Sequence, residues 1–114
     1  MALAEELPIY KATYDLVLVV FRLVKSFNKE YKYTIGESIK KEAIEAVTNI
    51  YRANSSQDKT VYLAKARENI EVIRLYGRLI KDLHQISIKQ LVFINGHIEN
   101  VSRQLTGWYK SQKN

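Results

Sequence analysis

Residues 7–56 read LPIYKATYDLVLVVFRLVKSFNKEYKYTIGESIKKEAIEAVTNIYRANSS, and they decide the fold because they hold two helical patterns joined by a short lysine- and tyrosine-rich link. Pro8, the only proline, suits the first turn of a helix, where its missing N–H loses no partner. The first pattern repeats every three or four residues through Tyr10, Tyr14, Val17, Leu18, Phe21 and Val24. This apolar arc is widened by Leu16, Val19 and Val20, which predicts burial on more than one side.

Two short sequences predict where later helices begin. Thr34 and Glu37 form a capping box, in which the threonine side chain accepts a hydrogen bond from the first turn and the glutamate side chain reaches back to the Thr34 N–H. Ser87 and Gln90 form a second box. We expect helices at about residues 8–28, 36–54, 59–84 and 88–110, and a frayed tail over 111–114. Four helices with short links predict a single all-α domain over residues 1–114, an up-down-up-down four-helix bundle.

Length and composition limit the class of protein. The 114 residues suit one domain, and the absence of cysteine excludes disulfides and thiolate metal sites. Glu5 and Glu6 stand where a signal peptide would carry positive charge. The longest apolar run, Leu16 to Phe21, is too short to span a bilayer. We therefore expect a soluble cytoplasmic protein with no membrane partner. Its net charge of +6 attracts polyanions such as RNA and DNA.

No residue pattern indicates catalysis. His84 and His97 fall on different predicted helices, and the Glu-x-x-His pair typical of di-iron bundles does not occur. The four glycines are scattered, so no phosphate-binding loop is present. We expect no enzyme activity, no metal and no cofactor. Gly77 and Gly96 lie inside predicted helices and indicate either a close approach of helices or subunits, or simple tolerance.

The third predicted helix carries four cations on one side, Arg67, Arg74, Arg78 and Lys81. They form either a solvated face, in which Glu71 pairs with Arg67 and Asp82 with Arg78, or a surface for an anionic partner. Arg74 and Arg78 are like charges four residues apart and repel each other mildly. That repulsion favours the anionic partner.

The first predicted helix carries a similar stripe of Lys11, Arg22, Lys25 and Lys29, which Asp15 dilutes. Aromatic rings can stack on bases, but rings at helical spacing more often belong to a core. Tyr31 and Tyr33, in the link, are better candidates for exposed rings than Trp108 or Tyr109. From the two stripes we select six candidate nucleic-acid- or partner-binding residues: Arg22, Lys25, Arg67, Arg74, Arg78 and Lys81.

Several segments resemble the accessory variability determinant proteins of diversity-generating retroelements: LPIYKATYDL, FRLVKSFNKEYKYTIGESIKKEAIEAV and IYRANSS in the first half, then ARENIEVIRLYGRLIKDLHQIS and GWYKS. The resemblance covers nearly the whole chain. These proteins belong to a wider group of small four-helix bundles. The group includes proteins encoded by intervening sequences in bacterial 23S ribosomal RNA genes.

The resemblance implies a ring-shaped homopentamer that binds a reverse transcriptase and its template RNA. It thereby implies support of mutagenic complementary-DNA synthesis and retrohoming, with no polymerase activity of its own. The wide apolar arc of the first helix agrees with a partner subunit, and the positive charge agrees with RNA and DNA. Two other classes stay open. One is a structural or nucleic-acid-binding protein of the ribosomal intervening-sequence type with no reverse transcriptase partner, and the other is a bundle with enzymatic activity.

Overall fold

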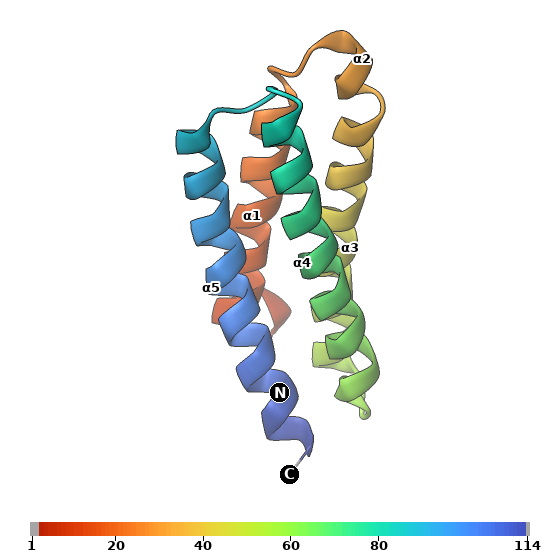
Figure 1. The fold of residues 1–114 in the computed structure, drawn as a ribbon. Coiled ribbons are helices and arrows are strands. Elements are labelled where there is room, and N and C mark those ends of the chain that lie inside the picture. The colour runs from red at the N-terminus through yellow and green to blue at the C-terminus, as the bar shows by residue number, and fades with distance from the viewer. Residues whose placement is uncertain (1–2, 114) are drawn as a thin grey trace.

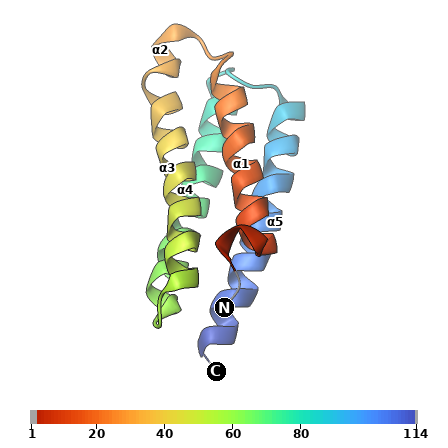
Figure 2. The ribbon, with the colours of Figure 1, turned by 180° about the vertical axis from the view of Figure 1, so that it is seen from behind.

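The computed structural model describes residues 3–113, and within them it contains helices and no strand. The elements in chain order are η1 (Ala4–Glu6), α1 (Pro8–Val24), α2 (Lys29–Lys32), α3 (Ile35–Ser55), α4 (Lys59–Asp82) and α5 (Ile88–Lys113). The four long helices α1, α3, α4 and α5 run alternately up and down side by side, as both views show (Figures 1 and 2). The predicted all-α four-helix bundle is confirmed. The pentameric ring stays a prediction.

The core lies along the axis of a bundle that measures about 44 by 21 by 21 Å. Each long helix packs against two neighbours, because α3 lies between α1 and α4, and α5 lies between α4 and α1. Each contributes side chains with essentially no exposed surface, such as Leu16, Ile50, Ile73 and Ile98. The hydrophobic period of each helix therefore predicts its place in the bundle.

The buried face of α1 differs from the expected one. Leu16, Val19 and Val20 are buried in the core of the same chain, whereas Tyr14 and Phe21 of the expected stripe are exposed. The wide apolar arc is therefore largely covered by α3 and α5. The argument that Leu16, Val19 and Val20 need a partner subunit is wrong.

The link after α1 is more structured than the sequence indicated. The helix ends at Val24 rather than near residue 28, and Phe27 is buried against the core. The chain then forms the four-residue helix α2. Thr34 makes no capping hydrogen bond with its side chain, because its Oγ1 donates to the Glu30 carbonyl at 2.8 Å. The predicted capping box is wrong, and Glu37 instead pairs with Lys40 at 2.8 Å.

The turn between α4 and α5 is closer to what the sequence predicted. The Ser87 N–H donates to Gln90 Oε1 at 2.9 Å, and the Gln90 N–H donates to Ser87 Oγ at 3.1 Å, so this capping box is confirmed. Helix α4 ends two residues earlier than expected, because His84 takes a left-handed conformation with φ of 60°. The Gln85 N–H then closes the helix on the Ile80 carbonyl at 2.8 Å.

Helix α5 extends through Lys113, so most of the tail predicted to be frayed is helical. Asn114 lies outside the described residues. Neither mid-helix glycine marks a tight crossing. A Cβ at Gly77 would meet Leu91 Cδ1 at an ordinary 3.6 Å, and a Cβ at Gly96 would meet nothing within 4 Å. The tight position is Gly36, where a Cβ would lie 2.8 Å from Val24 Cγ1.

Candidate nucleic-acid interface

Two connections meet at one end of the bundle. The α1–α2–α3 link and the α4–α5 turn lie together there, away from the chain termini (Figure 1). The Asn28 N–H donates to Gln85 Oε1 at 2.7 Å and joins residues 57 positions apart. We call residues 17–41 and 74–96 the basic end. It holds ten Lys or Arg and three Asp or Glu, a formal charge of +7, and the rest of the chain carries −1.

Arg22 and Lys25 belong to the basic end and are exposed at the close of α1. Lys29 lies in α2 and is exposed as well. In the part of the chain that the structure describes, none of the three forms an ion pair. Lys11, from the same predicted stripe, lies outside the basic end and pairs with Asp15 at 3.4 Å. The structure therefore divides this stripe into a paired part and an unpaired part.

Three cations of the α4 stripe come together at the basic end. Arg74, Arg78 and Lys81 line a groove of about 300 Å³ between α4 and α5, together with Asp82, Leu91 and Asn95. Arg78 is exposed and has no carboxylate partner among residues 3–113. The Arg78–Asp82 pair considered from the sequence does not form, because Asp82 lies 3.5 Å from Lys81 Nζ instead.

Arg74 is less available to an external anion than its position in the stripe indicated. Its guanidinium donates to Glu99 of α5 and lies 3.4 Å from Glu71 Oε2. The pKa of Arg74 is raised, chiefly by the hydrogen bond to Glu99, although desolvation opposes the shift. The anion that offsets this charge is therefore within the chain. The repulsion between Arg74 and Arg78 does not require an external anion.

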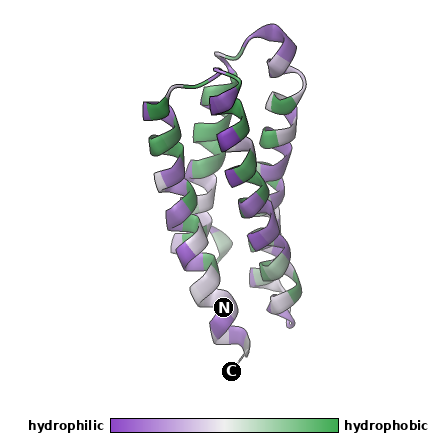
Figure 3. Ribbon diagram, viewed as in Figure 1, coloured by the Kyte–Doolittle hydropathy of each residue, from purple (hydrophilic) through white to green (hydrophobic). Residues whose placement is uncertain are grey.

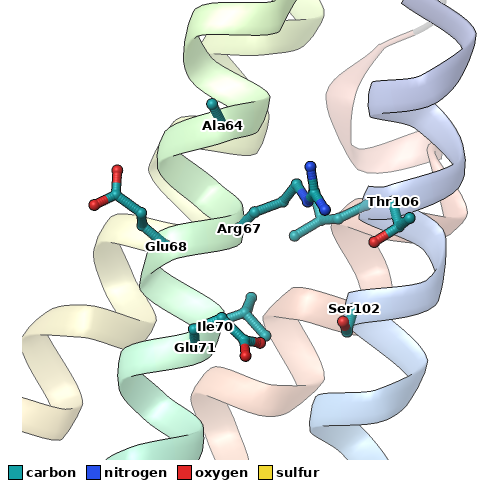
Figure 4. Close-up of a pocket in the computed structure, with 8 residues that line it drawn as sticks. Ala64, Arg67, Glu68, Ile70, Glu71, Ser102 and Thr106 are labelled. Carbon is teal, nitrogen blue, oxygen red and sulfur yellow. The ribbon is translucent and has the colours of Figure 1, made fainter.

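Arg67 lies apart from the other three, in a second groove of about 310 Å³ nearer the chain termini. Figure 4 shows its side chain reaching from α4 towards Thr106 of α5, above Ser102. The guanidinium lies over the Tyr109 ring, 4.7 Å from the ring centroid. The expected ion pair with Glu71 does not form, because Glu71 binds Arg74. Arg67 therefore serves the contact between α4 and α5.

The two stripes predicted from the sequence do not include four cations of the basic end: Lys32, Lys40, Lys41 and Lys89. They come from α2, α3 and α5, so no helical period joins them to the two stripes. Lys40 Nζ lies 5.2 Å from the centre of the Phe21 ring. Hydrophobic residues also concentrate in the upper turns of α5 (Figure 3), where Ile88, Val92 and Phe93 are exposed. The basic end thus combines uncompensated charge with exposed apolar surface.

A model of the bAvd-like family, the bacterial accessory variability determinants, matches residues 7–112. The chain belongs to this family. The match spans α1, α3, α4 and all but the last residue of α5, and it confirms the resemblance found in the sequence. Proteins of the bAvd-like family are accessory and non-catalytic in type. No curated protein matches the chain.

The bAvd-like bundle shows little that suggests other chemistry. Among residues 3–113, no group of three or more His, Cys, Asp or Glu side chains is placed to hold a metal ion. His84 occupies the α4–α5 turn, and His97 packs edge-on against Phe93 with ring centroids 5.0 Å apart. Within the same residues, no helix has both the length and the apolar character that crossing a bilayer requires.

Proposed function

We propose that this bAvd-like protein is the accessory protein of a diversity-generating retroelement. It binds the reverse transcriptase and its template RNA or DNA, and so supports mutagenic reverse transcription and retrohoming. It acts in the cytoplasm, as a homopentamer and without catalytic activity. The observation that carries the proposal is the concentration of uncompensated cations at one end of a bAvd-like bundle.

This charge distribution supports nucleic-acid binding. A formal charge of +7 gathered at one end attracts polyanions more strongly than the same charge spread over the surface. Phosphates that contact Lys and Arg release their counterions, so affinity falls steeply as salt rises. Arg22, Lys25 and Arg78 are exposed and form no ion pair among residues 3–113, so they are the first candidates for such contacts.

A ring would multiply the basic end around its axis. A closed ring of five chains repeats each basic end five times, so one polymerase–template complex meets a multivalent scaffold. Holding template and polymerase on the same scaffold raises the effective concentration of the template at the polymerase. Exposed apolar side chains at Tyr14, Phe21 and Val92 are available for contacts between subunits or with the polymerase.

The decisive experiment co-expresses this chain with the reverse transcriptase encoded beside it. We expect the two proteins to co-purify, and we expect template-directed complementary-DNA synthesis to fail or lose processivity without this chain. Native mass spectrometry should show five copies. No complex and unchanged synthesis would favour the ribosomal intervening-sequence alternative, for which no polymerase partner is expected. A clean monomer at micromolar concentration would exclude the ring.

A further inference from the structure

The α1–α2–α3 link presents an aromatic ring to solvent. Tyr33 follows α2 directly, and its side chain is 64% exposed, more than any other aromatic residue that the structure describes. Its neighbours in the link behave differently, because Phe27 is buried and Tyr31 packs partly against the core. The link therefore uses two of its rings to anchor itself and leaves the third ring outside.

The link that carries Tyr33 is held in place by close packing. Val24 and Phe27 are buried on one side of it. Gly36 lies so close to Val24 and to the Tyr31 carbonyl that a Cβ would come within 2.8 and 3.1 Å of them. The hydrogen bond from the Asn28 N–H to Gln85 fixes the link to the α4–α5 turn. A ring presented from a fixed turn loses little conformational freedom when a ligand stacks on it.

Three lysines lie within eight residues of Tyr33 in the sequence, and none forms an ion pair within residues 3–113. Lys29 is the first residue of α2, the four-residue helix that ends directly before Tyr33. Lys32 directly precedes Tyr33, and Lys25 follows the end of α1. In the described part of the chain, no ion pair involves Lys25, Lys29 or Lys32. An exposed ring among free cations suits a ligand with both flat faces and negative charge.

We propose that Tyr33 is a stacking platform for an unpaired base of single-stranded RNA, whose phosphates are bound by Lys25, Lys29 and Lys32. The inference rests on the proposed function and names the form of nucleic acid that this part of the basic end takes. Aromatic side chains in a basic setting bind single strands because every base has a face on which a ring can stack. A duplex covers those faces with neighbouring base pairs, so Tyr33 discriminates between the two forms.

The test compares three variants on two RNAs. Tyr33→Leu removes the aromatic face, Tyr33→Phe keeps it, and Tyr51→Leu removes a ring that is 56% exposed on α3, outside the basic end. Each variant is titrated with a short unstructured single-stranded RNA and with the corresponding duplex. We expect Tyr33→Leu to lower single-strand affinity by roughly fivefold or more, with little change on the duplex. Tyr33→Phe should bind like the parent, and so should Tyr51→Leu.

Each other outcome overturns the inference. If the parent binds single strands and Tyr33→Leu binds them equally well, Tyr33 is not a stacking platform, while the proposed function stands. If Tyr33→Phe fails like Tyr33→Leu, the hydroxyl and not the ring face is what binds. An equal loss on the duplex would indicate a backbone contact. If Tyr33→Leu loses only the reverse transcriptase in a pull-down, the ring is a protein contact. A parent that binds no RNA overturns both proposals.

Discussion

Helix α3 is joined to its two neighbours by links that use charged side chains in opposite ways. At the α3–α4 link, Lys59 is the first residue of α4, and its Nζ donates to the carbonyls of Ala53, Asn54 and Ser56 at 3.0 to 3.1 Å. In the α1–α3 link, Lys25 follows the end of α1 and is exposed without an ion pair among the described residues. A lysine beside a helix C-terminus can bind the last carbonyls of the helix, as Lys59 does, or remain exposed, as Lys25 does.

The acidic residues of the bundle follow the same division. Asp58 in the α3–α4 link accepts hydrogen bonds from the backbone and the hydroxyl of Thr60. Between α3 and α4, the Asn69 amide donates to Glu42 at 2.8 Å, and its oxygen accepts from the buried Asn49 at 2.9 Å. These polar groups outside the basic end are thus satisfied within the chain. At the basic end, Lys40, Arg74 and Lys81 form ion pairs, whereas Arg22, Lys25, Lys29 and Arg78 form none among residues 3–113.

The largest effect should follow from reversing charge at the basic end. With Lys25, Lys29 and Arg78 changed to glutamate, RNA affinity near 100 mM salt should fall roughly a hundredfold, because three phosphate contacts are lost. Arg52, Arg103 and Lys110 are exposed outside the basic end, and changing them to glutamate alters net charge equally. That control should bind within a few-fold of the parent in a filter-binding titration. Equal losses in both triple variants would mean that only net charge matters.

The second-largest effect should follow from adding a methyl group beneath the α1–α3 link. Gly36→Ala would place a Cβ against Val24 and should lower the free energy of unfolding by about 2 kcal/mol. Gly96→Ala is the matched control, because the space around Gly96 is open and alanine favours the helix by up to about 1 kcal/mol. Urea denaturation measures both. A neutral Gly36→Ala would show that Val24 and the link rearrange easily.

Removing the two link lysines should separate stability from binding. Lys59→Met leaves three carbonyls without their charged donor and should lower the free energy of unfolding by about 1.5 kcal/mol. Lys25→Met should change it by less than about 0.5 kcal/mol, because the Lys25 ammonium forms no ion pair among residues 3–113. RNA affinity should fall more in Lys25→Met than in Lys59→Met. A destabilised Lys25→Met would contradict the division between the two links.

The smallest effect should distinguish the two arginines of the α4–α5 groove. Arg74→Gln breaks the ion pairs with Glu99 and Glu71 and should lower the free energy of unfolding by about 0.5 kcal/mol at low salt. Arg78→Gln should leave stability unchanged and reduce RNA affinity a few-fold. Thermal melts at low and high salt, paired with RNA titrations, measure both. If Arg74→Gln weakens RNA binding more than Arg78→Gln does, Arg74 leaves Glu99 to contact RNA.

The sequence by itself determined the features that depend on neighbours along the chain. The hydrophobic period predicted four helices, and residues three positions apart formed the Ser87–Gln90 box. Pro8 begins α1 as its fixed φ suggests. The family was also recognisable from its segments. Local spacing suffices for these features, because the atoms that interact are within one helical turn.

Tertiary structure alone decided which cations remain available. Arg74 is bound by Glu99, 25 positions away, and Arg67 lies over Tyr109 of another helix. The sequence treated both as equal to Arg78. It also misjudged Thr34, whose Oγ1 donates to the Glu30 carbonyl and does not cap α3. Partners distant in sequence meet only when the four apolar faces close on one core. The availability of each charge at the basic end is therefore a property of packing, which the spacing of residues along one helix does not contain.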